Sequence, residues 1–207
     1  MPLPLELTNT EAIFLSASHS NEPALAQCLM GFFLSTGMRT IEICQIQVQD
    51  IIEISGQIHE KMIVRGNAER EIYLTNPKLK TLIVNYVNNR RKDGYHRNCF
   101  RCFSPTAPFF LRSNGTTFQL SARKTSRGHI SLSCPTLNQL IKVILKDAGI
   151  QSPSIDSGRR TLALKLKYQV DKKVIHNLLG NKDIATTNRL LSSKPLNMKQ
   201  ISEITLS

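Results

Sequence analysis

The sequence predicts an α+β domain that is mainly helical, with a small antiparallel three-stranded sheet near its N-terminal third. Apolar residues recur at helical spacing through most of the chain. Three short stretches between residues 50 and 74 are instead rich in isoleucine and valine and partly alternate, which is typical of strands. The length of 207 residues and a hydrophobic fraction of 41% suit one globular domain, which we expect to span residues 1–207.

Helices are expected at the start of the chain. Thr8 and Glu11 have the spacing of a capping box at the beginning of a short first helix. Pro23 suits the first turn of a buried apolar helix that ends near Gly37. One or two further helical turns are expected over residues 39–46.

The three predicted strands follow, and after them the chain returns to helices. The strands cover residues 50–55, 57–65 and 70–74, with glycine-containing turns between them. A helix begins at Pro77 and ends before Gly94, residues 94–134 are irregular, and an amphipathic helix begins at Pro135 and stops at Gly149. Four short helices are expected over residues 157–169, 171–180, 183–192 and 197–206.

The charge of the chain favours a polyanionic partner. A net charge of +12 and a pI near 9.8 point to nucleic acid first and to an anionic membrane second. No strongly amphipathic basic helix supports a membrane surface, and no apolar run has the roughly 18 residues of a membrane span. The N-terminus lacks the pattern of a secretory signal, so we expect a cytoplasmic protein that binds no membrane.

The five cysteines are interpreted as reduced thiols, because their number is odd and nothing indicates secretion. The alternative is a zinc site, since His96, Cys99 and Cys102 have spacings that a metal can use. A structural zinc ion needs four ligands, and the fourth would be Cys134 or a distant histidine. With a single CxxC motif in the chain, we expect no metal and no cofactor.

Several arginines are placed where they can bind an anion. Arg39 follows the buried second helix, and with Glu42 it forms either a structural ion pair or a phosphate-binding guanidinium held by that carboxylate. Arg159 and Arg160 lie in a first helical turn, where the helix dipole favours an anion over basic side chains, so we expect a bound anion there. A basic run further upstream is either a solvated loop or a phosphate-contacting arm. Its charged residues are Arg123, Lys124 and Arg127.

Three stretches, in order, resemble the catalytic domain of the tyrosine recombinases, or phage integrases. The stretch "LMGFFLSTGMRTIEICQIQVQDI" resembles the family's first arginine box, and "VRGNAEREIYLTNPKLKTLIVNYV" resembles its basic hairpin and the following helix. The stretch "IDSGRRTLALKLKYQVDKKVIHNLLGNKDIATTNRL" resembles its last block. The resemblance covers about Leu7 to Ile204 and implies the recombinase catalytic-domain fold, without a separate N-terminal DNA-clamping domain. It also implies double-stranded DNA as the partner, and DNA recombination or integration on a mobile element as the setting.

The resemblance also assigns roles to individual positions. It implies that Arg39 and Arg159 are a retained phosphate clamp, whereas the family's nucleophilic tyrosine is replaced by Leu190, which has no nucleophilic atom. The other substituted catalytic positions are Arg65 for the hairpin lysine, Asp156 for a histidine and Asn181 for a histidine or tryptophan. The expected DNA-binding residues are Arg39, Arg65, Arg123, Lys124, Arg127, Arg159 and Arg160.

The leading hypothesis is therefore a protein of this family that binds DNA through phosphates, with little sequence preference, and cannot cleave it. We expect the Asp156 carboxylate to form a salt bridge with Arg39, Arg159 or Arg160 while DNA is absent. The partner is DNA, with another recombinase subunit or a second copy of the chain as a further candidate. The C-terminal stretch "KPLNMKQISEITLS" suits exchange between neighbouring subunits and a self-packed final helix equally well.

Two other hypotheses remain open. One is an active or conditionally active recombinase whose nucleophile is unusual or supplied by a different protein. Among the tyrosines, Tyr73 and Tyr86 are expected in the core, Tyr168 lies more than two helical turns from Arg159, and Tyr95 is the least constrained. The other hypothesis is a folded domain or oligomerisation module that does not bind DNA, against which the net charge of +12 argues.

Overall fold

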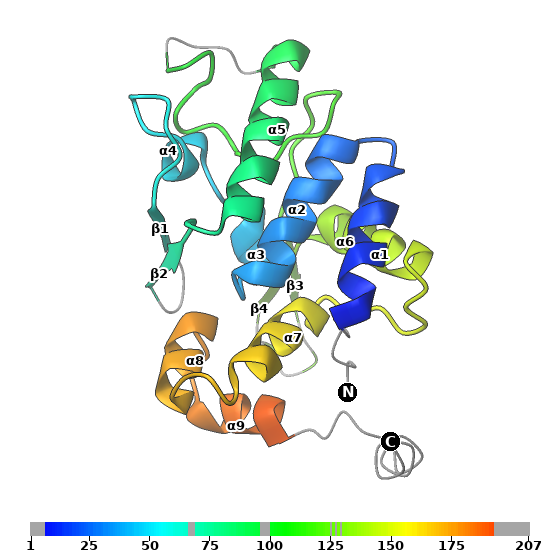
Figure 1. Ribbon diagram of the computed structural model, residues 1–207, viewed down its shortest axis with the longest axis vertical. Helices are drawn as coiled ribbons and strands as arrows, with labels where there is room; N and C mark the ends of the chain where they lie inside the picture. Colours follow the sequence, from blue (N-terminus) through cyan, green and yellow to red (C-terminus); the bar gives the residue numbers. More distant parts are fainter. Residues whose placement is uncertain are drawn as a thin grey trace.

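Helices make up about half of the described residues, and two short antiparallel ribbons lie among them (Figure 1). The computed structural model describes residues 7–65, 69–95, 100–124, 126, 128 and 130–192. Its helices are α1 (Leu7–Ser18), α2 (Pro23–Ser35), α3 (Thr40–Ile43), α4 (Val48–Ile51), α5 (Pro77–Asp93), α6 (Pro135–Asp147), α7 (Ser157–Leu166), α8 (Lys172–Leu179) and α9 (Ile184–Ser192). Its strands are β1 (Lys61–Val64), β2 (Arg70–Tyr73), β3 (Ser121–Lys124) and β4 (Ile130–Ser133).

Helix α2 forms the centre of the larger part of the molecule. It packs against α1, α5, α6 and α7 and is buried along most of its length, as its apolar sequence predicts. Phe32 meets Phe110 edge to face, with ring centroids 5.5 Å apart, and Phe109 and Phe110 pack the same way at 5.0 Å. The core of this part is therefore an aromatic cluster built around α2 and α5.

Proline and asparagine start the long helices where the sequence predicts. Pro23, Pro77 and Pro135 each occupy the first turn of a helix, where a missing N–H costs nothing. Asn76 caps α5 by accepting a hydrogen bond from the Leu79 N–H, and Gly94 ends α5 in the left-handed region at φ 75°. These helix bounds agree with the sequence analysis.

The last three described helices form a smaller unit with its own core. Ala163, Ile175, Leu179 and Leu191 bring α7, α8 and α9 together, below the larger helical body in the view of Figure 1. Helix α7 joins the two units by packing against α2. The contact is close at Gly158, where a Cβ atom would overlap the Phe33 carbonyl oxygen.

The sheet differs from the prediction. The sequence predicts a first strand over residues 50–55, but Val48–Ile51 form the short helix α4, because the Asp50 carboxylate accepts a hydrogen bond from the Gln47 N–H in a capping box. What remains is the two-stranded ribbon β1–β2, with Met62 opposite Ile72. A second ribbon, β3–β4, occupies part of the stretch that the sequence analysis treats as irregular.

Two details at the ends of the chain complete this comparison. Thr8 lies inside α1, because the described helix already includes Leu7, so the predicted cap at Thr8 is wrong. The helix expected over residues 197–206, and with it the stretch proposed for exchange between subunits, lies outside the described residues. In the described part of the chain, no helix is long and apolar enough to cross a bilayer.

Candidate functional site

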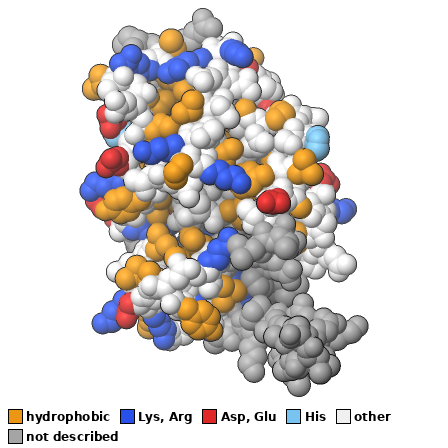
Figure 2. Space-filling model, in the orientation of Figure 1, with side chains coloured by type: hydrophobic (Ala, Val, Ile, Leu, Met, Phe, Trp, Pro, Cys, Tyr) orange, Lys and Arg blue, Asp and Glu red, His pale blue; other side chains and the backbone are white. Residues whose placement is uncertain are grey.

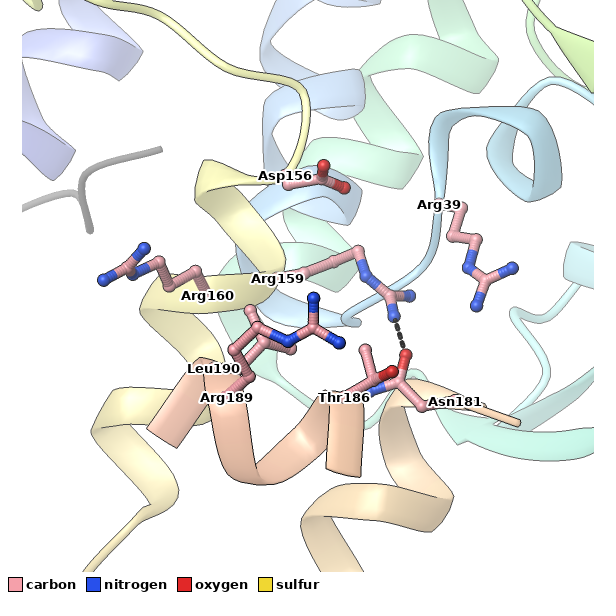
Figure 3. A pocket seen from close by; sticks show the side chains of 8 residues that line it. All are labelled: Arg39, Asp156, Arg159, Arg160, Asn181, Thr186, Arg189 and Leu190. Carbon is pink, nitrogen blue, oxygen red and sulfur yellow. Dashed lines mark hydrogen bonds between the residues drawn. The ribbon is translucent and has the colours of Figure 1, made fainter. Parts of the chain in front are cut away.

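A cavity of about 350 Å³ lies where the N-terminus of α3, the first turns of α7 and the inner face of α9 meet (Figure 3). The fold brings together side chains that are more than a hundred residues apart in the sequence. Its described lining includes four arginines and one carboxylate, so an anion is its natural ligand. The lining residues are Arg39, Asp156, Arg159, Arg160, Asn181, Thr186, Arg189 and Leu190.

Arg159 is the most constrained of these arginines. Its side chain is buried, with Nη1 donating to the Gly37 carbonyl at 2.7 Å and Nη2 donating to Asn181 Oδ1 at 2.9 Å (Figure 3). Gly37 has φ +66°, a conformation that lets the turn after α2 direct this carbonyl at the guanidinium. Burial, followed by repulsion from Arg39, lowers the pKa of Arg159 to about 10, so it keeps its charge at neutral pH.

Arg39 faces the same cavity from the start of α3. It is half-buried, and its Nη2 reaches the Gly180 carbonyl at 3.4 Å. Its backbone N–H, rather than its guanidinium, binds the Glu42 carboxylate, at 2.6 Å. Neither form of the Arg39–Glu42 pairing expected from the sequence is present, because a different arginine occupies that carboxylate.

That arginine is Arg70, which the sequence analysis missed. Its two terminal nitrogens donate to the two Glu42 oxygens at 3.0 and 2.9 Å, and its Nε donates to the Leu178 carbonyl at 2.7 Å. The bidentate pair is buried and links β2 to α3 and α8. The alternation of β2 could have identified Arg70, because this arginine shares the inward face of the strand with Ile72. A charged side chain at a core-facing position needs a buried partner.

The Glu42 carboxylate stays ionised in this setting. Burial alone would raise its pKa, but the hydrogen bonds from Arg70 and from the Arg39 backbone, together with the charge of Arg70, lower the pKa below its ordinary value. Arg70 and Glu42 therefore neutralise each other. The charges of Arg39 and Arg159 are left to face the cavity.

Asn181 is fixed by a buried network. Its Nδ2 donates to Thr187 Oγ1 at 3.1 Å, and that oxygen lies 3.0 Å from His176 Nδ1. The amide oxygen is thereby directed at Arg159. Gly180, just before it, closes α8 at φ +57°, where a Cβ would lie 2.6 Å from Arg70 Nη1. The Asn181 amide therefore holds the Arg159 guanidinium in place.

Helix α9 supplies the remaining wall of the cavity. Leu190 lines it and packs against the small core of α7, α8 and α9, so its side chain presents only carbon to the cavity. Figure 3 shows the Arg189 guanidinium directed into the cavity, toward Arg159. Arg189 and Thr186 were not among the predicted site residues. They lie one helical turn apart on α9, which is the spacing that could have identified them.

None of the four tyrosines, all of which the structure describes, lines this cavity. Tyr86 is buried, as predicted, and its hydroxyl bonds to the backbone of Phe109 and Leu111. Tyr73 is 62% exposed, so its predicted place in the core is wrong; β2 turns its alternate residues inward. Tyr95 and Tyr168 lie on the surface.

Asp156 lines the cavity without making the predicted salt bridge. It is exposed at the start of α7, and within the described residues it forms no ion pair with Arg39, Arg159 or Arg160. Its backbone N–H instead donates to Ser154 Oγ at 3.2 Å. The carboxylate still acts on Arg159 through space, since its charge partly offsets the fall in the pKa of that arginine. Figure 3 shows Arg160 pointing away from Arg39.

The other predicted DNA-binding residues lie outside the cavity. Arg65 follows β1 in a separate groove, where its Nη2 lies 3.3 Å from Asp50 Oδ1. Arg123 and Lys124 are exposed on β3, so the run expected to be a loop is partly a strand. Arg127 lies outside the described residues.

The described cysteines are free thiols. They are Cys28, Cys44, Cys102 and Cys134. Over the described ranges, no group of histidine, cysteine, aspartate or glutamate residues has the arrangement of a metal site. His96 and Cys99, which the alternative zinc hypothesis requires, lie outside those ranges.

The fold is similar to that of solved recombinases. An XerA recombinase superposes with a TM-score of 0.70 at 18% identity, over 99% of this chain and 62% of its own. An XerH recombinase bound to a palindromic difH substrate gives 0.68 at 15% identity, over 100% and 53%. A lambda integrase dimer bound to a COC' core site gives 0.62 at 15% identity, over 94% and 61%. The chain thus spans between 53% and 62% of the length of these proteins.

At such low identity, the superpositions show a shared fold and nothing more. No protein of curated function matches the sequence significantly. The sequence does match the family model described as "Phage integrase family" over residues 5–195, which is nearly the whole chain. The chain therefore belongs to the phage integrase family.

Proposed function

We propose that this protein binds double-stranded DNA with a backbone phosphate in the arginine-lined cavity, and that it does not cleave the strand. The observation that carries the proposal is the composition of that cavity, which Arg39, Arg159 and Leu190 line. The resemblance assigns Leu190 to the position of the family's nucleophile.

The binding half of the proposal rests on charge and geometry. Arginine binds phosphate oxygens through two parallel hydrogen bonds, and Arg159 is pre-oriented by Gly37 and Asn181. Arg70 satisfies Glu42, so that carboxylate does not compete for the phosphate. Lysine and arginine side chains are spread over the face drawn in Figure 2, among fewer acidic ones, in keeping with the net charge of +12.

The inactive half of the proposal rests on what the cavity lacks. Strand cleavage in this family uses a tyrosine nucleophile, and none of the four tyrosines lines the described cavity, where Leu190 presents only carbon. The positions of proton transfer have also changed, and each lost group typically costs about 10²–10⁴-fold in rate. Asn181 does not titrate, and Arg65 lies in another groove.

A protein of this kind would act by occupying DNA or by joining another recombinase. The solved relatives include recombinases bound to their DNA substrates, and we propose recombination or integration on a mobile element as the setting for this chain. We also propose that residues 1–207 act as one catalytic-type domain. The partner subunit would be an intact recombinase or a second copy.

A second function is favoured by one feature, the open cavity that retains both arginines. A tyrosine supplied by a different recombinase could enter it and attack a phosphate held there. This alternative predicts cleavage only in a mixture of the two proteins, with the covalent adduct on the partner.

The binding proposal is tested by measuring affinity for a duplex across a series of salt concentrations. The logarithm of affinity should fall linearly with the logarithm of salt, by about 0.9 for each phosphate neutralised. Arg39→Ala should weaken binding and reduce that slope by about one phosphate. Arg91→Ala is the matched control, because it removes the same charge from the exposed C-terminal turn of α5, at the opposite end of the molecule from α9 (Figure 1). Equal effects of the two substitutions, or no binding at low salt, would contradict the proposal.

A further inference from the structure

The β3–β4 ribbon lies close to the element that follows Arg39 of the cavity. Strand β4 contacts α3, the short helix that begins after Arg39 (Figure 1). Every described residue of the paired strands except Ser133 is exposed, including Ile130 at 74% and Leu132 at 48%. Such exposure is unusual for a ribbon that serves only the core, so the ribbon is available to a partner.

The pairing divides the ribbon into two faces. Arg123 lies opposite Ser131, and Ser121 lies opposite Ser133, so these four side chains share one face. The other face consists of Ala122, Lys124, Ile130 and Leu132. One face therefore carries a guanidinium flanked by hydroxyl groups, all of which can hydrogen-bond, and the other face is mainly apolar.

The ribbon lies in a stretch of the sequence that contains only positive charge. From Gly94 to Lys146 there is no aspartate and no glutamate, whereas arginine and lysine recur throughout. A polyanion can thus approach either strand without local repulsion from carboxylates of the same segment. This complementarity favours DNA over a protein surface of mixed charge.

We propose that the ribbon enters the major groove of the DNA held at the cavity and that Arg123, on its polar face, selects a guanine. The major groove is about 12 Å wide and admits a two-stranded ribbon, and four paired residues at about 3.4 Å each reach roughly 14 Å along it. Arginine binds the N7 and O6 atoms of guanine through two hydrogen bonds, and a serine hydroxyl such as Ser131 can contact a neighbouring base.

This inference rests on the proposed function, because it assumes a duplex bound at the cavity. It adds what phosphate contacts cannot supply, which is sequence preference. The sequence alone predicts little preference, because its net charge of +12 and its arginines indicate binding through phosphates. The paired strands give Arg123 a fixed direction and a serine neighbour, which a solvated loop would not.

The test is selection of duplexes from a randomised pool by the full chain, followed by competition between the selected site and versions with single base changes. The protein should select a guanine at one position and bind the changed site roughly 5- to 100-fold more weakly. Arg123→Ala and Arg123→Lys should both abolish that ratio, because lysine keeps the charge but not the bidentate fork. Lys124→Ala, on the opposite face, should weaken binding to all sequences alike and keep the ratio.

Each other outcome overturns the inference in a recognisable way. Two outcomes would refute the role of the ribbon while leaving phosphate binding supported. One is salt-dependent binding without any selected base, and the other is a guanine preference that persists in Arg123→Ala. The preference could instead be lost only in the Ile130→Ser, Leu132→Ser double variant, together with a change in oligomeric state. That outcome would show that the apolar face is a protein interface and would contradict base selection by Arg123. Failure to bind any duplex at low salt overturns both proposals together.

Discussion

At the scale of single residues, the arginines in and near the cavity are of two kinds. Arg70 is neutralised by Glu42 and serves the fold, whereas Arg39 and Arg159 line the cavity. The sequence could predict Arg39 and Arg159, because family motifs carry them. It could not predict that Arg70 takes the Glu42 carboxylate, since that contact depends on how β2 meets α3 in three dimensions.

Replacing Asp156 tests whether its carboxylate opposes DNA. The side chain is exposed at the rim of the cavity, so Asp156→Asn should tighten duplex binding by about two- to fivefold at low salt, in line with charge effects of about 0.3–1 kcal/mol at exposed helix ends. Asp147→Asn removes the same charge from the exposed end of α6 and should have a smaller effect. Unchanged or weaker binding by a folded Asp156→Asn protein would show that the carboxylate does not oppose DNA.

Lowering the pH should remove the contribution of the ionised Glu42 carboxylate to the stability of the fold. Its pKa is lower in the folded protein than the ordinary value of 4.5, so the ionised carboxylate stabilises the fold above about pH 4.5, and this contribution is lost as pH falls through the folded pKa. The loss amounts to at most about 1.4 kcal/mol per pH unit for one proton. Denaturant unfolding at a series of pH values between about 6 and 3 should show a shallower decline for Glu42→Gln than for the wild type. Parallel curves would rule out this contribution.

At the scale of elements, the sequence predicted the helices better than the ribbons. Pro23, Pro77 and Pro135 marked helix starts that the structure confirms, because a proline at the first turn acts locally. Residues 50–55 were predicted as a strand from their isoleucines, but the Gln47–Asp50 capping box and burial of Ile51 favour a helical turn. The β3–β4 ribbon could not be predicted from alternation, because most of its residues are exposed and no core imposes a hydrophobic period on them.

The packing of α7 on α2 should depend on one glycine. Gly158→Ala places a methyl group against the Phe33 carbonyl, so the helices must separate, and we expect a loss of about 1–3 kcal/mol in the free energy of unfolding. Gly31→Ala is the matched control: its methyl would meet only the flexible ends of Leu79 and Leu82, and alanine favours the helix. Denaturant unfolding measures both variants, and a Gly158→Ala protein as stable as Gly31→Ala would contradict this packing.

At the scale of the whole molecule, two parts of the fold together build the arginine-lined cavity. The larger helical body contributes Arg39, and the smaller unit of α7, α8 and α9 contributes the rest of the cavity.

The substitution Leu190→Tyr alone should not produce cleavage, because Asp156 would still repel the phosphate and Asn181 would still be unable to transfer a proton. Weak cleavage is expected first in a fourfold variant, provided that its groups come within about 0.5 Å of productive geometry. This variant combines Leu190→Tyr, Asp156→His, Arg65→Lys and Asn181→His.

Covalent trapping on a nicked duplex decides whether this chain cleaves DNA. The wild-type protein and Leu190→Tyr are each incubated with the nicked substrate, denatured, and assayed for protein that remains attached to DNA. The fourfold variant is the comparison in which an adduct is allowed. We predict salt-dependent binding and no adduct for the first two proteins. A covalent adduct formed by the wild-type chain would contradict this prediction, and mapping the attached residue would identify the nucleophile.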